Sequence, residues 1–205
     1  IGHATARLML EEGAKLVLSD LSVEGLERAM VDLPAGEIAL VPADVSDAAS
    51  VRSLADAAKE RFGHVDVVFS NAGNFGAVAP IESYPEDVFD AVHAVHVRGA
   101  FLVAKYFTPL MGQGGSIVIN SSVAATRGDP GVYAYITAKH AQVGLMRCLA
   151  KELAPRGIRV NTIHPGPIDN DFQHNVEKGL GEEIGRDGTE FFNEMIPMGR
   201  HGSPE

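Results

Sequence analysis

A tyrosine and a lysine stand four positions apart in a segment with helical apolar periodicity. Tyr135 and Lys139 therefore share one face of a predicted helix. A free tyrosine has a pKa of about 10, too high for a base at neutral pH, but a neighbouring ammonium favours the phenolate. Such a pair can take a proton from an alcohol or return one to a ketone. Tyr133 is the local rival, but its partner four residues later is the uncharged Thr137.

Two serines at the end of a predicted strand offer a second hydroxyl for the same reaction. Ser122 can hydrogen-bond a substrate oxygen and hold it near Tyr135. Ser121 is its rival, and a polar strand end is the structural alternative for both.

The elements that must position these side chains alternate along the chain. Helical patterns cover about 1–12, 22–31, 48–61, 85–111 and 132–153, and β-branched apolar runs cover 15–19, 38–41, 66–70, 116–120 and 159–163. The runs are continuously apolar, which is typical of parallel strands covered on both faces. This order predicts an α/β fold with a doubly wound, Rossmann-like parallel sheet in three α/β/α layers, as a single domain over residues 1–205.

The segment 170–204 has a different composition from the rest. It is rich in glycine, acidic, and carries Phe172, Phe191, Phe192, Met195 and Met198. We interpret it as a cover over a substrate pocket, and a plain surface excursion is the alternative. The name "cover" is used below for this segment.

Composition and charge limit the class of partner. The 205 residues carry a net charge of −10, and a surface that binds phosphates needs an excess of Lys and Arg. Nucleic acid and anionic membranes are therefore not expected partners. We see no signal-peptide pattern and no apolar stretch of membrane-spanning length, so we expect a cytoplasmic protein. The single cysteine, Cys148, lies in an apolar helical pattern and is predicted to be buried and unreactive.

Several small or acidic residues at element ends are suited to a dinucleotide. Gly2 opens the first helix and lets a backbone N–H approach a pyrophosphate. Asp20 ends the next strand, where an acid can hydrogen-bond an adenosine ribose, although a helix cap is the simpler interpretation of this residue alone. Asn71, Ala72 and Gly73 follow a strand, and small side chains there let a loop pass close to a bound ring, with an ordinary turn as the alternative.

Together these residues resemble the short-chain dehydrogenase/reductase family over nearly the whole chain. Ile1-Gly2 resembles the end of its glycine-rich motif, Asn71-Ala72-Gly73 its NAG motif, Tyr135 and Lys139 its YxxxK motif, Asn161 a residue of its sixth strand, and Pro165-Gly166-Pro167-Ile168 its PG motif. Ser122 lies at the family's usual distance before the tyrosine. The family's strand order is 3-2-1-4-5-6-7, so we expect the first and last strands to be absent here and the sequence to be part of a longer protein.

The resemblance also implies the residues that bind the cofactor. These are Ile1, Gly2, Asp20, Leu21, Asp44, Val45, Asn71, Ala72, Gly73, Tyr135, Lys139, Pro165, Gly166, Ile168 and Asn170. Within this set, Asp44 and Val45 match an adenine-contacting pair, and Lys139 would hold the nicotinamide ribose. Asp20 and Leu21 favour NAD over NADP, because a carboxylate accepts from both ribose hydroxyls and repels a 2′-phosphate.

One position departs from the family pattern. His96 stands where the family has an asparagine that helps to hold a proton-relay water near the lysine. Histidine can donate and accept, so the relay is expected to survive in altered form or to be weakened. The resemblance thus implies a catalytic set of Ser122, Tyr135, Lys139 and His96. No metal is expected, because His93, His96 and His164 lack a carboxylate partner at a recognisable spacing.

The leading hypothesis is an oxidoreductase that transfers a hydride between NAD(H) and a secondary alcohol or ketone. The alternatives are a dinucleotide-binding homologue whose catalysis His96 impairs, a purely structural subunit, and a sugar-nucleotide epimerase with the same tyrosine–lysine pair. Intact Tyr135, Lys139 and Ser122 oppose the first alternative. The helices over 85–111 and 132–153 resemble those that pair between subunits in the family, which implies a homodimer or homotetramer.

Overall fold

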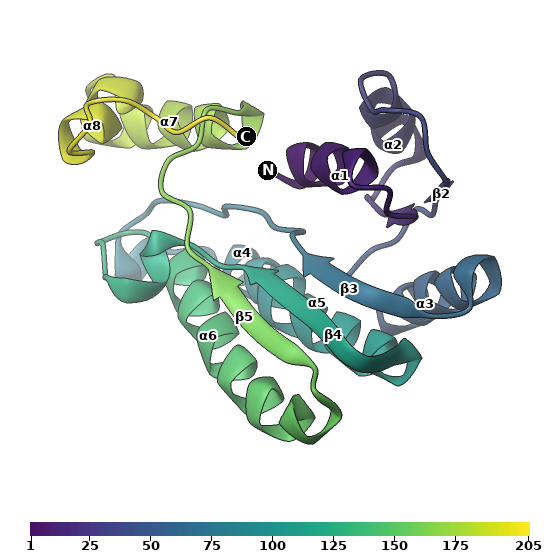
Figure 1. Cartoon of the computed structure of the whole chain (residues 1–205). Helices are drawn as coiled ribbons and strands as arrows, with labels where there is room; N and C mark the ends of the chain where they lie inside the picture. The colour runs from purple at the N-terminus through teal and green to yellow at the C-terminus, as the bar shows by residue number, and fades with distance from the viewer.

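Helices and strands alternate along the chain in the order that the sequence predicts (Figure 1). The computed structural model describes all residues, 1–205. The helices are α1 (Gly2–Glu11), α2 (Val23–Met30), α3 (Ala48–Phe62), α4 (Glu86–His93), α5 (Gly99–Phe107), α6 (Tyr133–Leu153), α7 (Asp171–Ile184) and α8 (Gly188–Met195). The strands are β1 (Leu16–Leu18), β2 (Ile38–Leu40), β3 (Val65–Ser70), β4 (Met111–Asn120) and β5 (Arg159–Ile163). No helix combines the length and the apolar character needed to cross a membrane.

The five strands form two parallel sheets. β1 pairs with β2 in one sheet, and the order in the other is β3-β4-β5. The division falls between β1 and β3, which is where the expected strand order places the absent first strand. The α/β class with parallel strands is therefore confirmed.

The main core lies on one face of the β3-β4-β5 sheet. Side chains of α3 and α5 pack there against the inward residues of the strands, among them Val51, Ile117 and Ile119, each at most 1% exposed. The face turned to the viewer in Figure 1 carries no helix over these strands. Val67 and Ile163 remain 46% and 38% exposed, so these strands are not covered on both faces as their apolar runs predict.

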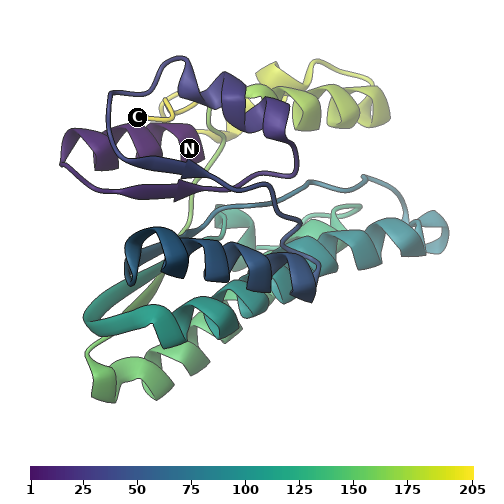
Figure 2. The ribbon, with the colours of Figure 1, turned by 90° about the vertical axis from the view of Figure 1, so that its right-hand side faces the viewer.

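The cover and α1 lie beside each other above the carboxyl ends of β3, β4 and β5 (Figures 1 and 2). The two chain termini are close together in both views. Open α/β sheets bind ligands at the carboxyl ends of their strands, so this arrangement encloses the edge where a site is expected.

The predicted helix over 85–111 is divided and shorter than expected. A π-helical turn at Ala94–Arg98 separates α4 from α5, and α5 ends at Phe107. The sequence predicts a strand only from residue 116, but β4 begins at Met111. This earlier start arises because Met111 pairs with Val65, and a register shift follows that makes the beginning of the strand a bulge.

Cys148 and the cover both differ from a simple interpretation of the sequence. Cys148 is exposed, so the prediction of a buried thiol is wrong. It lies on the outward side of α6, where the apolar periodicity of the helix is weak. Most of the cover, for which no secondary structure was predicted, forms α7 and α8.

Candidate active site

Helix α6 is held firmly by small residues on its inner face. Ala134 and Ala138 are fully buried and pack against Val92 of α4. Small side chains let the two helices approach closely. This packing fixes the face of α6 that carries Tyr135 and Lys139.

Tyr135 is half-buried beside both of its expected partners. The Lys139 ammonium lies 5.3 Å from the centre of the Tyr135 ring. Burial raises the pKa of Tyr135, and a hydrogen bond with the Ser122 side chain acts in the opposite direction. The sequence predicts a pKa lowered by Lys139, but burial outweighs the neighbouring amine in this structure.

Lys139 is almost completely buried, at 3% exposure. Its Nζ donates a hydrogen bond of 2.7 Å to the carbonyl oxygen of Asn120, at the end of β4. Burial lowers the pKa of Lys139 to about 7. The amine can therefore gain or lose a proton near neutral pH, which suits a group that works beside a proton donor.

The two serines have different environments. The Ser121 hydroxyl donates to the carbonyl oxygen of Lys139 at 3.1 Å, so it ties β4 to α6. The Ser122 Oγ accepts from the Ala124 backbone N–H at 3.1 Å and lies near enough to the Tyr135 hydroxyl to lower its pKa. Ser122 is thus the serine that the structure brings to the tyrosine hydroxyl.

His96 lies in the π-helical turn and is 1% exposed. Its ring meets the Tyr135 ring edge-on, with centroids 5.5 Å apart. Its Nε2 lies 2.7 Å from the carbonyl oxygen and 3.1 Å from the backbone nitrogen of Asn74, while its Nδ1 is buried without a partner. Burial, with the Lys139 charge as a smaller cause, lowers the pKa of His96 to about 4, so the ring is neutral at pH 7.

The imidazole of His96 also explains why residue 73 is a glycine. A Cβ on Gly73 would lie 2.5 Å from the His96 Cε1, closer than real contacts allow. Gly73 and His96 are thus matched, which sequence spacing alone does not show.

A chain of contacts connects the candidate catalytic residues to the start of the first helix. The Asn120 side-chain amide donates to the Asn71 Oδ1 at 2.8 Å. A Cβ on Gly2 would lie 2.8 Å from the Asn71 Nδ2, so a larger residue would displace this side chain. Ile1 is the N-cap of α1 and provides no side-chain cap, which leaves the first backbone N–H groups of the helix to bind an anion.

The expected adenosine-binding residues lie at the carboxyl ends of β1 and β2, away from Tyr135. The Ala43 N–H donates to the Asp20 carbonyl oxygen at 2.9 Å, which holds the two strand ends together. Leu21 is 73% exposed, and its N–H donates to the Asp20 carboxylate at 2.7 Å. The Asp44 carboxylate accepts from both the N–H and the hydroxyl of Ser46.

Val45 and the PG segment have mainly structural contacts in this structure. Val45 packs against Gly99, where an added Cβ would meet its Cγ2 at 2.9 Å. The Pro165 carbonyl accepts from the Val123 N–H, and Gly166 is exposed next to it. Ile168 forms a β-bridge with Gly202 in the cover.

Asn170, expected to bind the cofactor, is the N-cap of α7. Its Oδ1 accepts from the Gln173 N–H at 3.0 Å. This bond occupies the side-chain oxygen and leaves its amide free to donate.

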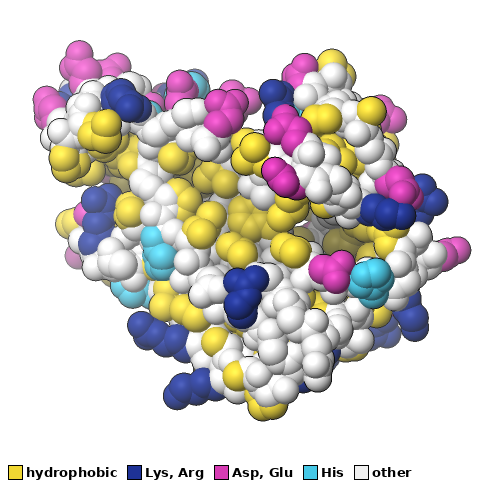
Figure 3. All heavy atoms as spheres, viewed as in Figure 1, with side chains coloured by type: hydrophobic (Ala, Val, Ile, Leu, Met, Phe, Trp, Pro, Cys, Tyr) yellow, Lys and Arg dark blue, Asp and Glu magenta, His cyan; other side chains and the backbone are white.

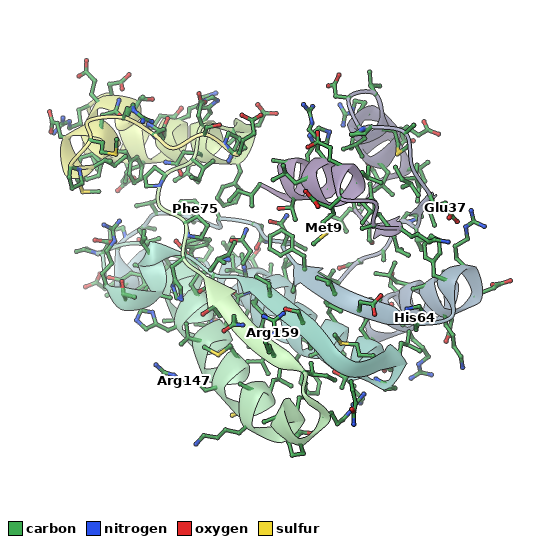
Figure 4. The ribbon with its side chains drawn as sticks, in the orientation of Figure 1. Met9, Glu37, His64, Phe75, Arg147 and Arg159 are labelled. Atoms are coloured by element: carbon green, nitrogen blue, oxygen red, sulfur yellow. The ribbon has the colours of Figure 1, made fainter.

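Two phenylalanines beside Tyr135 were not predicted as site residues. The centroids of Phe75 and Phe172 lie 5.5 and 6.4 Å from that of Tyr135. Phe75 follows the Asn71–Gly73 loop, and its position next to that motif was an available signal. Figure 4 shows Phe75 at the level of the strand ends, below the cover helices.

A second buried polar cluster lies inside the cover, around Glu177 at 4% exposure. Its carboxylate accepts from Gln173 Nε2 at 3.1 Å and from Thr189 Oγ1 at 2.7 Å, and it pairs with the His201 ring. This carboxylate therefore joins α7, the start of α8 and the C-terminal end of the cover.

The remaining histidines that invite a metal interpretation have other contacts. His93 Nδ1 lies 3.0 Å from the Phe89 carbonyl oxygen, and His164 Nδ1 lies 2.9 Å from that of Ser122. No group of three or more His, Cys, Asp or Glu side chains is placed to hold a metal ion.

Comparison with known proteins identifies the family of this chain. The family profile described as enoyl-(acyl carrier protein) reductase matches residues 1–205. Levodione reductase from Leifsonia aquatica is 40% identical over the whole chain and 79% of its own length. A crystal structure of levodione reductase superposes with a TM-score of 0.92 at 38% identity, covering 98% of this chain and 81% of that one. NAD+-bound xylitol dehydrogenase superposes with a TM-score of 0.90 at 33% identity, covering 98% and 82%. The chain belongs to the short-chain dehydrogenase/reductase family of oxidoreductases.

Proposed function

We propose that this protein transfers a hydride between NAD(H) and a secondary alcohol or ketone, with Tyr135 as the general acid and base. The observation that supports this best is the position of the Tyr135 side chain, which lies beside Ser122 with its ring centre 5.3 Å from the Lys139 ammonium. The relatives with alcohol- or ketone-oxidoreductase names support the reaction class, including meso-2,3-butanediol dehydrogenase from Serratia marcescens at 34% identity.

In this proposal each side chain has a distinct role. Because burial raises the pKa of Tyr135, its hydroxyl is protonated at neutral pH and can donate to a ketone oxygen. Ser122 holds the same oxygen by a second hydrogen bond. Lys139, with a pKa of about 7, stabilises the phenolate that remains and can return the proton.

The residues at the carboxyl edge fit a nicotinamide dinucleotide. When bound, that cofactor supplies the hydride acceptor or donor. The uncapped start of α1 and the close approach of Gly2 to Asn71 suit a pyrophosphate, and the exposed loop residues Ala72 and Gly73 leave room for a flat ring. Asp20 supports NAD over NADP, because its carboxylate would repel a 2′-phosphate and no basic residue follows it.

The cover is proposed to close over the bound substrate.

The chain is proposed to form a homodimer or homotetramer. The outward faces of α4, α5 and α6 form a shallow groove that includes Val97, Leu145 and the 48% exposed Phe101. A charge in this groove, introduced by Phe101→Asp, is expected to reduce the oligomer to monomers in light-scattering measurements.

The experiment that tests the proposed function follows NADH formation from secondary alcohols. Tyr135→Phe is expected to lower kcat about 10³-fold, because it removes the transferred proton. Tyr133→Phe is the matched control on the same helix, expected within about twofold of the wild type since its hydroxyl has no role in the transfer. Dinucleotide binding without turnover in the wild type would instead support a binding protein whose catalysis His96 impairs.

A further inference from the structure

The aromatic rings at the catalytic tyrosine carry information about the substrate. Phe75 comes from the loop after β3 and Phe172 from the first turn of α7, so the scaffold and the cover each place one ring against Tyr135. The ring planes are tilted by 50° and 38° to that of Tyr135, and the distances lie in the range of attractive aromatic contacts. Phe172 keeps 40% of its surface exposed, so it has apolar area left to contact another molecule.

The charges around this group of rings do not suit an anionic substrate. The nearest cation, Lys139, is buried and donates to the Asn120 carbonyl. The arginines of the cover are engaged elsewhere, since Arg186 pairs with Glu194 and Arg200 donates to the His201 carbonyl. Segment 170–204 holds seven acidic and three basic residues, so its net negative charge disfavours an anionic substrate.

The space-filling view agrees with an apolar approach to the site. Hydrophobic side chains gather on the face between the cover and the strands (Figure 3). A substrate whose oxygen meets Tyr135 and Ser122 must place its carbon frame against the neighbouring apolar rings.

The geometry points to an uncharged ketone or secondary alcohol whose reacting carbon belongs to a compact apolar ring, held between Phe75 and Phe172. This inference rests on the proposed function and specifies its substrate class. An alicyclic frame presents two apolar substituents of the reacting carbon as one rigid body, which packs against two tilted aromatic faces without loss of internal freedom. Phe75 and Phe172 are then specificity-determining residues.

The test compares reduction of cyclohexanone, acetone and the anion pyruvate by NADH. For the wild type, kcat/KM is expected to be highest for cyclohexanone and lowest for pyruvate. Phe172→Ala is expected to lower kcat/KM for cyclohexanone about tenfold, with acetone changed by no more than about twofold, because acetone has too little apolar area to use the ring. Phe172→Leu retains most of the apolar area and should recover most of the loss.

Phe191→Ala is the matched control, because Phe191 lies in the same cover but packs on Phe192 and not on Tyr135. It should leave the ratio of cyclohexanone to acetone unchanged. Equal losses for both ketones in Phe172→Ala, an unchanged ratio, or a wild type that prefers pyruvate would each overturn the inference while hydride transfer stands. Failure of the proposed function has a different signature, namely turnover that survives in Tyr135→Phe or no turnover of any ketone.

Discussion

Two buried polar clusters in this protein differ in how completely their atoms are paired. Around His96 and Lys139, four buried side-chain atoms have no hydrogen-bond partner: Asn74 Oδ1, His96 Nδ1, Asn120 Oδ1 and Gln142 Oε1; one further such atom, Asn193 Oδ1, lies in the cover. Around Glu177 in the cover, both carboxylate oxygens and each of the three partner side chains are paired. An unpaired buried polar atom costs about 1–3 kcal/mol, so we expect the first cluster to contribute less to stability than the second.

The contrast distinguishes the candidate active site from a cluster whose contacts are structural. Burial shifts the pKa values of His96, Tyr135 and Lys139 in the first cluster, as is common where groups must exchange protons. The Glu177 cluster instead satisfies its buried charge and joins three segments of the cover. Substitutions should therefore affect activity in the first cluster and stability in the second.

The largest expected effect is on activity, in Lys139→Met. We expect kcat/KM to fall about 10³-fold, because the variant loses the charge that supports the tyrosine. The free energy of unfolding should not fall at pH 7, since the variant removes an amine whose charging burial disfavours. Lys151→Met, at an exposed position of α6, is the control for both measurements. A marked loss of stability in Lys139→Met would contradict the separation of the two clusters.

Glu177→Gln should show the opposite behaviour. The amide cannot accept from all three donors, so the free energy of unfolding in urea should fall by about 3 kcal/mol. Hydrogen exchange should accelerate in α7 and α8 first, because the carboxylate joins them. Glu183→Gln, exposed on α7, should change stability by no more than about 0.5 kcal/mol. Equal stability of the two variants would show that the cluster is not structural.

His96 predicts a pH dependence with a defined sign. Its pKa is about 4 in the folded chain and near 6.5 when unfolded, so the unfolded state binds more protons between these values. Stability is therefore lost as the pH falls from 6.5 towards 4. His96→Asn should remove about 2 kcal/mol of the difference in unfolding free energy between pH 7 and pH 5. Parallel pH profiles of variant and wild type would mean that His96 is not neutral when folded.

The smallest expected effect distinguishes two buried glutamines. Gln142 donates to the uncharged backbone carbonyl of His96, and the Gln142 Oε1 has no partner. Gln173 instead donates to the charged Glu177 carboxylate. Because hydrogen bonds to charged groups are stronger, Gln173→Leu should cost about 1 kcal/mol more than Gln142→Leu. Urea unfolding of both variants measures this difference, and a reversed order would count against the comparison.

The sequence by itself determined the features that depend on neighbours in the chain. Periodicity and turn residues predicted all five strands and most helices, and the spacing of Tyr135 and Lys139 placed them on one helix face, because these are local properties. The same patterns failed at Met111, where pairing with Val65 extends β4 backwards across a bulge. They failed again at Cys148, because a weakly amphipathic helix does not reveal which side faces the core.

Only the tertiary structure decided which of these residues meet and in what environment. It separated Ser122 from Ser121, matched His96 to Gly73, and brought Phe75 and Phe172 to Tyr135 from segments far apart in the sequence. It also reversed the predicted direction of the Tyr135 pKa shift. The physical reason is that burial and contact between distant segments set desolvation and packing, and neither quantity is encoded in local spacing.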